Sequence, residues 1–344
     1  MIRLIDIKEL SKLRKSLPLI DVRSPAEFRN GHIPDAFNIP LFNNEERKAV
    51  GIAYQQQGRN AAVLKGLDLV GIKLSGFVKQ AQKIAPDQEL LIHCWRGGMR
   101  SESMAWLLSL AGFTIHILQG GYRAYRRFIG QAWQVPSQII ILSGKTGSGK
   151  TEILQFLAKS GHQVLDLEHY AHHKGSAFGA LGQEPQPTSE QFENDIAEIW
   201  QELDLNQPVW IEDESRNIGR VIIPEKLFLA MSKARVISLD MPKPLRIQRL
   251  IQDYANYPKN LLIDSIEKIT RRLGGQNMKS AVSAVQENDF ATAIDLVLNY
   301  YDKAYYYDLI KKEEGKVYQL SVESADAEVN ANKILNFCQT NRLI

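Results

Sequence analysis

The feature of this sequence that most constrains its fold is a glycine-rich segment placed directly after a β-branched, apolar run. Residues 139–142 are Ile-Ile-Ile-Leu, and residues 144–151 have the pattern G-x-x-x-x-G-K-T of a phosphate-binding loop, or P-loop. Residues 152–159 favour a helix, which completes the strand, loop and helix that the motif requires. Loop N–H groups and the helix dipole bind phosphate. The sequence therefore predicts a phosphate site at Gly144, Gly147, Ser148, Gly149, Lys150 and Thr151.

Acidic side chains are expected beside this loop. Lys150 is expected to reach the terminal phosphate, and the hydroxyl of Thr151 to ligate Mg²⁺. Two further predicted strands, residues 163–169 and 208–215, end in carboxylates, and strand ends meet at one edge of a parallel sheet. These acids are expected to hold metal-bound water or a substrate hydroxyl, and the alternative is that they are only solvated. The acids are Asp166, Glu168, Glu212 and Asp213.

Four arginines on two predicted helices are candidates for a mobile lid over the phosphates or for contacts to a nucleic acid. The helices are expected at residues 244–254 and 262–273, and for any single arginine a solvated helix face is the alternative. Three histidines at positions 169, 172 and 173 lack cysteine partners, so no structural metal is expected. The four arginines are Arg246, Arg249, Arg271 and Arg272.

The other half of the chain contains a candidate nucleophile. Residues 90–93 predict a buried strand that ends at Cys94, and a glycine-bearing loop, CWRGGMRS, leads into a helix that continues to Leu110. Loop N–H groups, the helix dipole, Arg96 and Arg100 would all stabilise a thiolate or bind an oxyanion. The alternative is a buried structural cysteine.

Composition limits the class of protein. The 344 residues suit two domains, and 24% charged with 44% hydrophobic residues is typical of a soluble globular protein. With only two cysteines, Cys94 and Cys338, a reducing compartment is expected rather than a disulfide framework. The charged N-terminus does not resemble a signal peptide, and no apolar run approaches the roughly 20 residues that span a bilayer. We therefore expect a cytoplasmic protein without a membrane partner.

The two halves differ in charge. Residues 1–135 contain 19 Lys and Arg against 11 Asp and Glu, a balance of +8, whereas the remainder has a balance of −5. A basic half indicates a polyanionic partner such as nucleic acid. The alternative is an ordinary difference in isoelectric point between domains.

Three segments of the first half, DVRSPAEFRNGHIPDAFNIP, HCWRGGMRS and LQGGYRAY, resemble the rhodanese domain over residues 5–128. The resemblance implies that Cys94 is the nucleophile and carries a persulfide or perselenide, with Arg100 closing the loop. Asp21 and Arg23 match the early DVR segment of the family. Many sulfur-transferring members have a C-x₄-R loop, whereas this loop is C-x₅-R. The longer loop resembles relatives that bind a larger anion, so we expect a substituted phosphate rather than thiosulfate as its ligand.

The order of both sets of motifs, with DLEHYAHHKGSAFG, IEDESRNIG and RRLGGQN in the second half, resembles the bacterial tRNA 2-selenouridine synthase family. The expected fold is α/β throughout. A rhodanese-like three-layer domain (1–130) and a linker (131–137) precede a P-loop NTPase-like parallel-sheet domain (138–344).

The resemblance also implies an activity. Selenium from selenophosphate replaces the 2-thio sulfur of the wobble uridine in tRNA, through an S-geranylated intermediate formed from geranyl diphosphate. Two other classes stay open. One is an ATP-dependent kinase or adenylating enzyme with an accessory sulfurtransferase domain, and the other is a non-catalytic, nucleotide-gated binding module.

Overall fold

The chain folds into two compact units, Met1–Ala132 and Trp133–Ile344. The computed structural model describes residues 1–133, 138–313 and 315–344. Helix α7 (Gly121–Ala132) continues to the end of the first unit. The first residues of the expected linker are therefore helical, and its residues 134–137 lie outside the described part of the chain.

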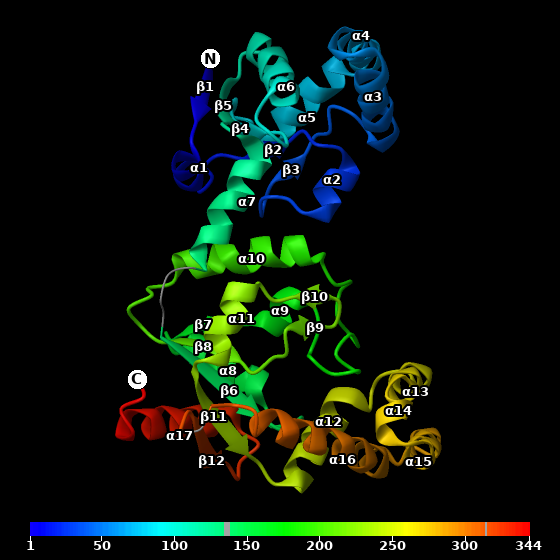
Figure 1. Cartoon of the computed structure of the whole chain (residues 1–344), viewed down its shortest axis with the longest axis vertical. Coiled ribbons are helices and arrows are strands. Elements are labelled where there is room, and N and C mark those ends of the chain that lie inside the picture. Colours follow the sequence, from blue (N-terminus) through cyan, green and yellow to red (C-terminus); the bar gives the residue numbers. More distant parts are fainter. Residues whose placement is uncertain (134–137, 314) are drawn as a thin grey trace. The chain divides into compact units, whose positions relative to one another are not determined.

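The first unit is built on a five-stranded parallel sheet with strand order β1-β5-β4-β2-β3. Its strands are short, almost uninterrupted apolar runs, as expected where helices cover both faces of a sheet. The main core packs α5 and α6 against the sheet, and α1 contacts α7 (Figure 1). The strands are β1 (Ile2–Ile5), β2 (Leu19–Asp21), β3 (Phe37–Asn38), β4 (Glu89–His93) and β5 (Thr114–Leu118). The helices before α7 are α1 (Ile7–Leu13), α2 (Pro25–Asn30), α3 (Asn44–Gln57), α4 (Arg59–Gly71), α5 (Leu74–Ile84) and α6 (Met99–Leu110).

The second unit contains another five-stranded parallel sheet, with strand order β12-β11-β6-β8-β7. The strand that precedes the P-loop, β6 (Ile139–Gly144), is fully buried at the centre. The other strands are β7 (Gln163–Leu165), β8 (Val209–Glu212), β11 (Arg235–Asp240) and β12 (Val317–Ser321), with an antiparallel pair β9 (Asn217–Ile218) and β10 (Val221–Ile222) beside them. The helices next to the sheet are α8 (Lys150–Lys159), α9 (Leu167–Ala171), α10 (Ser189–Glu202), α11 (Glu225–Ser232) and α17 (Ala327–Thr340).

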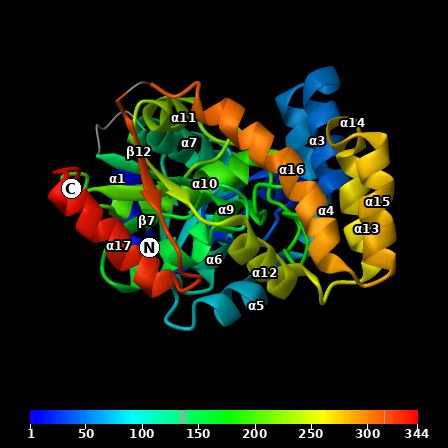
Figure 2. The same ribbon diagram turned by 90° about the horizontal axis from the view of Figure 1, so that it is seen from below.

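Five helices of the second unit form a group with a core of its own, which we call the helical subdomain. Its apolar cluster is distinct from the one that packs on the sheet. Figure 2 shows α13, α14 and α15 beside the long helix α16. The subdomain consists of α12 (Lys243–Tyr254), α13 (Lys259–Lys268), α14 (Thr270–Leu273), α15 (Gly275–Gln286) and α16 (Phe290–Leu309). Among the described residues, no helix combines the length and apolarity needed to cross a membrane.

Candidate functional site

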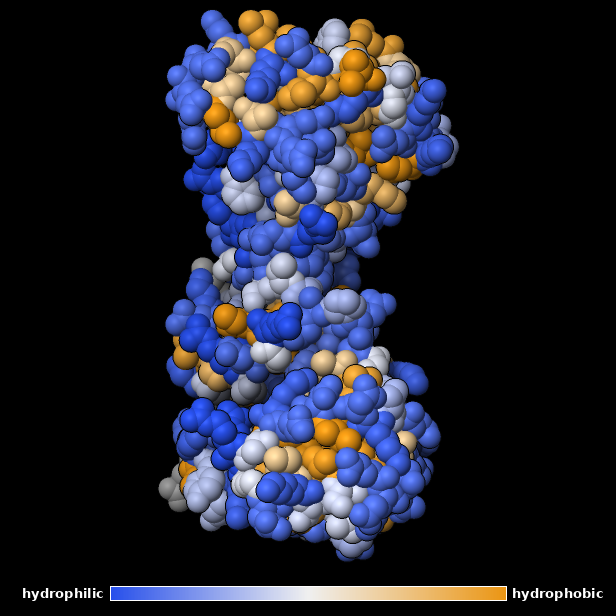
Figure 3. Space-filling model, turned by 90° about the vertical axis from the view of Figure 1, so that its right-hand side faces the viewer, coloured by the Kyte–Doolittle hydropathy of each residue, from blue (hydrophilic) through white to orange (hydrophobic). Residues whose placement is uncertain are grey.

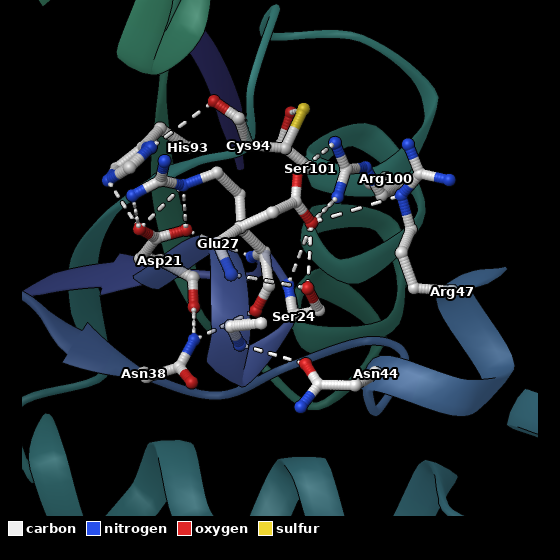
Figure 4. A network of polar contacts seen from close by, with 12 residues as sticks. Asp21, Ser24, Glu27, Asn38, Asn44, Arg47, His93, Cys94, Arg100 and Ser101 are labelled. Carbon is white, nitrogen blue, oxygen red and sulfur yellow. Dashed lines mark hydrogen bonds and ion pairs between the residues drawn. The ribbon is translucent and has the colours of Figure 1, made fainter. Parts of the chain in front are cut away.

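The predicted strand, loop and helix around Cys94 are present in the structure. Strand β4 ends at His93, and α6 begins at Met99, directly after the loop. Cys94 is 3% exposed, and its Sγ lies 3.3 Å from the Oγ of Ser101, which donates a hydrogen bond to it (Figure 4). The thiol therefore lies at the base of the loop, next to the N-terminus of α6.

The Cys94 loop is fastened to the first turn of α7. The backbone N–H groups of Tyr122 and Arg123 donate to the carbonyl oxygens of Cys94 and Trp95, at 2.9 and 3.0 Å. Within the described ranges, the N–H groups of residues 95–99 donate to no backbone acceptor. These donors, at a helix N-terminus, are available to an anion.

Gly121 allows this close approach. Its φ of +57° lies in the left-handed region, and a Cβ there would overlap the carbonyl oxygen of Cys94. We expect Gly121→Ala to destabilise the first unit by at least about 2 kcal/mol in urea unfolding of the full chain. Gly130→Ala, on the same helix, meets no atom within 4 Å. That control should gain roughly 0.5–1 kcal/mol in helix propensity. Equal stability of the two variants would contradict this account.

Arg100, which the resemblance implied closes the Cys94 loop, directs its side chain to an acid on α2. Its two terminal nitrogens donate to the carboxylate of Glu27, at 2.9 and 3.3 Å, and Arg47 lies 3.8 Å from the same carboxylate (Figure 4). Burial acts to raise the pKa of Glu27, but the Arg100 guanidinium overcomes it and holds that pKa below its usual value. Arg100 thus joins α6 to α2, and Arg96 is the exposed arginine on the Cys94 loop itself.

A buried ionic network lies at the end of β4, next to the Cys94 loop, where the Nδ1 of His93 is 3.3 Å from the carbonyl oxygen of Cys94. The guanidinium of Arg23, 1% exposed, binds both carboxylate oxygens of Asp21 and lies 3.8 Å from the ring centroid of Tyr122. Burial lowers the pKa of His93, whose Nε2 lies 3.7 Å from Asp21. Because breaking a buried pair leaves an uncompensated charge, this network fixes the strands that carry Cys94. The early DVR segment therefore has a structural role here.

The P-loop has the expected geometry in the second unit. Among the described residues, Ser148 alone of residues 146–151 donates its N–H to a backbone acceptor, the Lys145 carbonyl. The Nζ of Lys150 lies 3.0 Å from the Gly144 carbonyl oxygen, so its ammonium bends back over the loop. The hydroxyl of Ser148 is buried and has no hydrogen-bond partner. Such unpaired donors at a helix N-terminus fit a phosphate or diphosphate.

Of the acids expected beside the P-loop, Asp166 and Asp213 are bound by other groups, whereas Glu168 contacts the loop. Strand β7 ends at Leu165, so the prediction of a strand to residue 169 is wrong. Asp166 instead caps α9 by accepting the N–H of His169 at 2.8 Å. Asp213 is bound by the ammonium of Lys312 at 2.6 Å and also accepts a hydrogen bond from the hydroxyl of Ser143, the residue directly before Gly144. Glu168 accepts the hydroxyl of Thr151 at 3.2 Å and is therefore the acid next to the P-loop.

Two glutamates lie beside Glu168, the buried Glu212 and the partly buried Glu214, and the sequence analysis did not select Glu214 as a site residue. Glu212 is 3% exposed, and one of its oxygens accepts the N–H of Glu168 at 2.8 Å. Burial raises the pKa of Glu168, although the Lys150 ammonium acts against it. Burial first, and then neighbouring carboxylates, raise the pKa values of Glu212 and Glu214 well above the usual range. Within the described residues, no three His, Cys, Asp or Glu side chains form a metal-binding group. Any Mg²⁺ here would depend mainly on phosphate oxygens and Thr151.

The raised pKa of Glu212 gives a pH-dependent prediction. A carboxyl group whose folded pKa lies above its unfolded value stabilises the fold below about pH 4.5, and this stabilisation is lost as the pH rises through the folded value. We expect Glu212→Gln to melt a few degrees above the parent chain at pH 8 and close to it at pH 4. The exposed Glu323→Gln should show no such trend, and a constant difference for Glu212→Gln would contradict the assignment.

Two of the four arginines predicted to form a lid are held in ion pairs. Arg246 is 2% exposed, binds both carboxylate oxygens of Asp302 and donates to the carbonyl oxygen of Thr146, which corrects the expectation of a mobile lid or tRNA contact there. Arg249 pairs with Glu152 at 2.7 Å. Both residues therefore fix the P-loop from the side of α12.

The other two arginines lie on the surface of the helical subdomain. Arg271 and Arg272 are both exposed, and Arg272 donates to the Tyr300 hydroxyl at 3.1 Å. Their predicted role as lid or tRNA contacts stays a prediction.

Both halves of the chain match known families. The model of the tRNA 2-selenouridine synthase AAA domain matches residues 137–334, and that of the rhodanese-like domain matches residues 6–128. Proteins named tRNA 2-selenouridine synthase from Shewanella denitrificans and Shewanella oneidensis are 35% and 36% identical to this chain. Those alignments cover 88% and 86% of this chain, and 91% and 87% of the relatives. A relative of the same name from Bdellovibrio bacteriovorus is 37% identical over 83% of this chain and 74% of its own. The chain therefore belongs to the tRNA 2-selenouridine synthase family.

Proposed function

We propose that this enzyme exchanges sulfur for selenium at C2 of the wobble uridine in tRNA, and that it does so in two steps. The first step uses geranyl diphosphate at the P-loop, and the second uses selenophosphate at the Cys94 loop. The observation that carries the proposal is that one chain of this family holds two loops of different chemistry, most of whose N–H groups lack backbone acceptors among the described residues. One loop contains a thiol, and the other a lysine beside buried acids.

The first step makes the sulfur a leaving group. The thiocarbonyl sulfur of 2-thiouridine attacks the first carbon of geranyl diphosphate; a C–S bond forms, the C–O bond breaks and the ring loses its N3 proton. The departing diphosphate gains negative charge, and preorganised donors stabilise such charge most strongly. The free N–H groups of the P-loop, the Ser148 hydroxyl and the Lys150 ammonium supply these donors. Mg²⁺ bound with the diphosphate would neutralise further charge, next to Thr151.

The second step delivers selenium. Selenium adds at C2, the C–S bond breaks and geranyl thiol leaves. The selenium–phosphorus bond is then hydrolysed to phosphate, and the ring regains its N3 proton. The N–H groups of residues 95–99 suit the phosphate portion of selenophosphate, and the Sγ of Cys94 lies beside them. In this step selenium is bound there as selenophosphate.

The tRNA is expected to reach the Cys94 loop through a basic surface. Arg96 on the loop, and Arg123 and Arg127 on the first two turns of α7, are all exposed. One guanidinium nitrogen of Arg127 lies 3.8 Å from the position of a Cβ on Gly120, next to the loop. Together with the balance of +8 in residues 1–135, these side chains can neutralise backbone phosphates.

The test is mass analysis of nucleosides from 2-thiouridine-containing tRNA incubated with the protein, geranyl diphosphate and selenophosphate. The proposal expects a geranylated nucleoside first and a selenium-containing nucleoside afterwards. Replacing selenophosphate by thiosulfate should stop the reaction at the geranylated nucleoside. An unchanged nucleoside mass together with consumption of ATP would instead support a kinase or adenylating enzyme.

A further inference from the structure

The helical subdomain contains an apolar cavity that reaches the P-loop. Its lining comes from α12, α13, α15 and α16, from residues 176 and 178 of the segment between α9 and α10, and from Thr146 of the P-loop. Figure 3 shows apolar side chains gathered among hydrophilic ones on the lower part of the molecule, where α13–α15 face the viewer. The cavity is thus part of the unit that binds phosphate.

The contact between cavity and P-loop is close. Thr146 belongs to the P-loop and also lines the cavity. Leu250 of α12 lines the cavity too, and its Cγ would lie 3.0 Å from a Cβ placed on Gly147 of the P-loop. Arg246 holds this junction by donating to the Thr146 carbonyl oxygen at 3.1 Å. The P-loop and the apolar cavity therefore share the wall formed by Thr146 and Leu250.

The chemistry of the lining selects a hydrocarbon. Most of the lining is aliphatic or aromatic, including Ile266, Val297 and Leu298. The hydroxyl of Tyr301 at its edge already accepts the N–H of Ala177 at 3.0 Å. A nucleobase would bring several donors and acceptors that such a lining leaves unpaired, which is unfavourable. An alkyl chain loses nothing there and gains from burial.

We infer that this cavity binds the hydrocarbon chain of an isoprenoid diphosphate whose diphosphate lies on the P-loop. The inference rests on the proposed function and adds the place and the selectivity of substrate binding. Each buried methylene contributes about 0.8 kcal/mol, so a chain five carbons shorter should bind at least about 100-fold more weakly.

The test compares binding of four probes to the full chain: inorganic diphosphate and the dimethylallyl, geranyl and farnesyl diphosphates. Ala293→Phe places a ring in the cavity, because Ala293 is 4% exposed and lines it. Ala291→Phe adds the same ring to the exposed side of α16 and is the matched control. We expect Ala293→Phe to weaken geranyl diphosphate binding at least tenfold, with inorganic and dimethylallyl diphosphate little affected. The control should bind all four probes as the parent chain does.

A second variant covers the case in which Ala293→Phe does not fold, which loss of inorganic diphosphate binding would reveal. Val297→Ala enlarges the cavity and should shift the preference from geranyl towards farnesyl diphosphate. Equal affinity of the parent chain for geranyl and inorganic diphosphate would overturn the inference, as would unchanged chain-length preference in both variants. Tight, cavity-dependent binding without any change in nucleoside mass would overturn the proposed function and leave the inference standing.

Discussion

Lys150→Ala is expected to lower the rate of nucleoside geranylation by about 10²–10³-fold, the usual cost of removing one preorganised donor from a developing anion. The ammonium of Lys150 bends over a loop in which most N–H groups have no backbone acceptor among the described residues. It also lies close enough to Glu168 and Glu214 to offset part of the rise that burial causes in their pKa values. The measurement is the single-turnover formation of geranylated nucleoside from 2-thiouridine-containing tRNA.

A lysine in the same loop provides the control for this variant. Lys145 pairs with Asp240 at the surface, at 3.2 Å, and Lys145→Ala should keep most of the activity. Selenium transfer to tRNA that already carries the geranylated nucleoside should also be retained in Lys150→Ala. If both steps fell together, Lys150 would have a role in folding or tRNA binding instead of diphosphate departure.

Cys94→Ala is expected to abolish formation of the selenium-containing nucleoside while the geranylated nucleoside accumulates. The physical reason is that the Sγ of Cys94 lies next to the N-terminus of α6, where the hydroxyl of Ser101 donates a hydrogen bond to it. The measurement is the ratio of geranylated to selenium-containing nucleoside at completion. Cys94→Ser keeps a small polar atom in the same place and separates carriage of selenium on sulfur from simple binding of selenophosphate.

The second thiol of the chain is the control for Cys94. Cys338 is buried in α17, where burial raises its pKa to about 11. Cys338→Ala should lose some stability but keep both products in the parent ratio. Normal selenium incorporation by Cys94→Ala would contradict a chemical role for the thiol and leave the loop as an anion cradle.

Local features of both sites could be predicted because each depends on residues near one another in sequence. The P-loop and the Cys94 loop both lie between a buried strand and a helix, as their glycine spacing indicates. Strand β7 was predicted too long because the apolar alternation continues past Leu165, although Asp166 caps a helix there.

The contacts that decide side-chain roles could not be predicted because they join distant segments. Arg100 finds Glu27 across 73 positions, and Lys312 finds Asp213 across 99. The spacing of apolar residues along the chain indicates neither of these ion pairs, and it does not indicate that Glu214 lies next to Glu168. The apolar cavity likewise depends on how α12, α13, α15 and α16 pack, and the sequence analysis did not predict α15 and α16.

The fastening of the Cys94 loop to α7 has a mechanical consequence. Tyr122 and Arg123 bind the loop through their backbone, and the helix they begin runs without interruption for 12 residues to Ala132, the last residue of the first unit. The backbone of the Cys94 loop and the first turn of α7 are therefore linked directly by these two hydrogen bonds. Any change in the direction of the first turn of α7 would pull on the carbonyl groups of Cys94 and Trp95, so the N–H groups of the loop keep their arrangement only while this turn keeps its place.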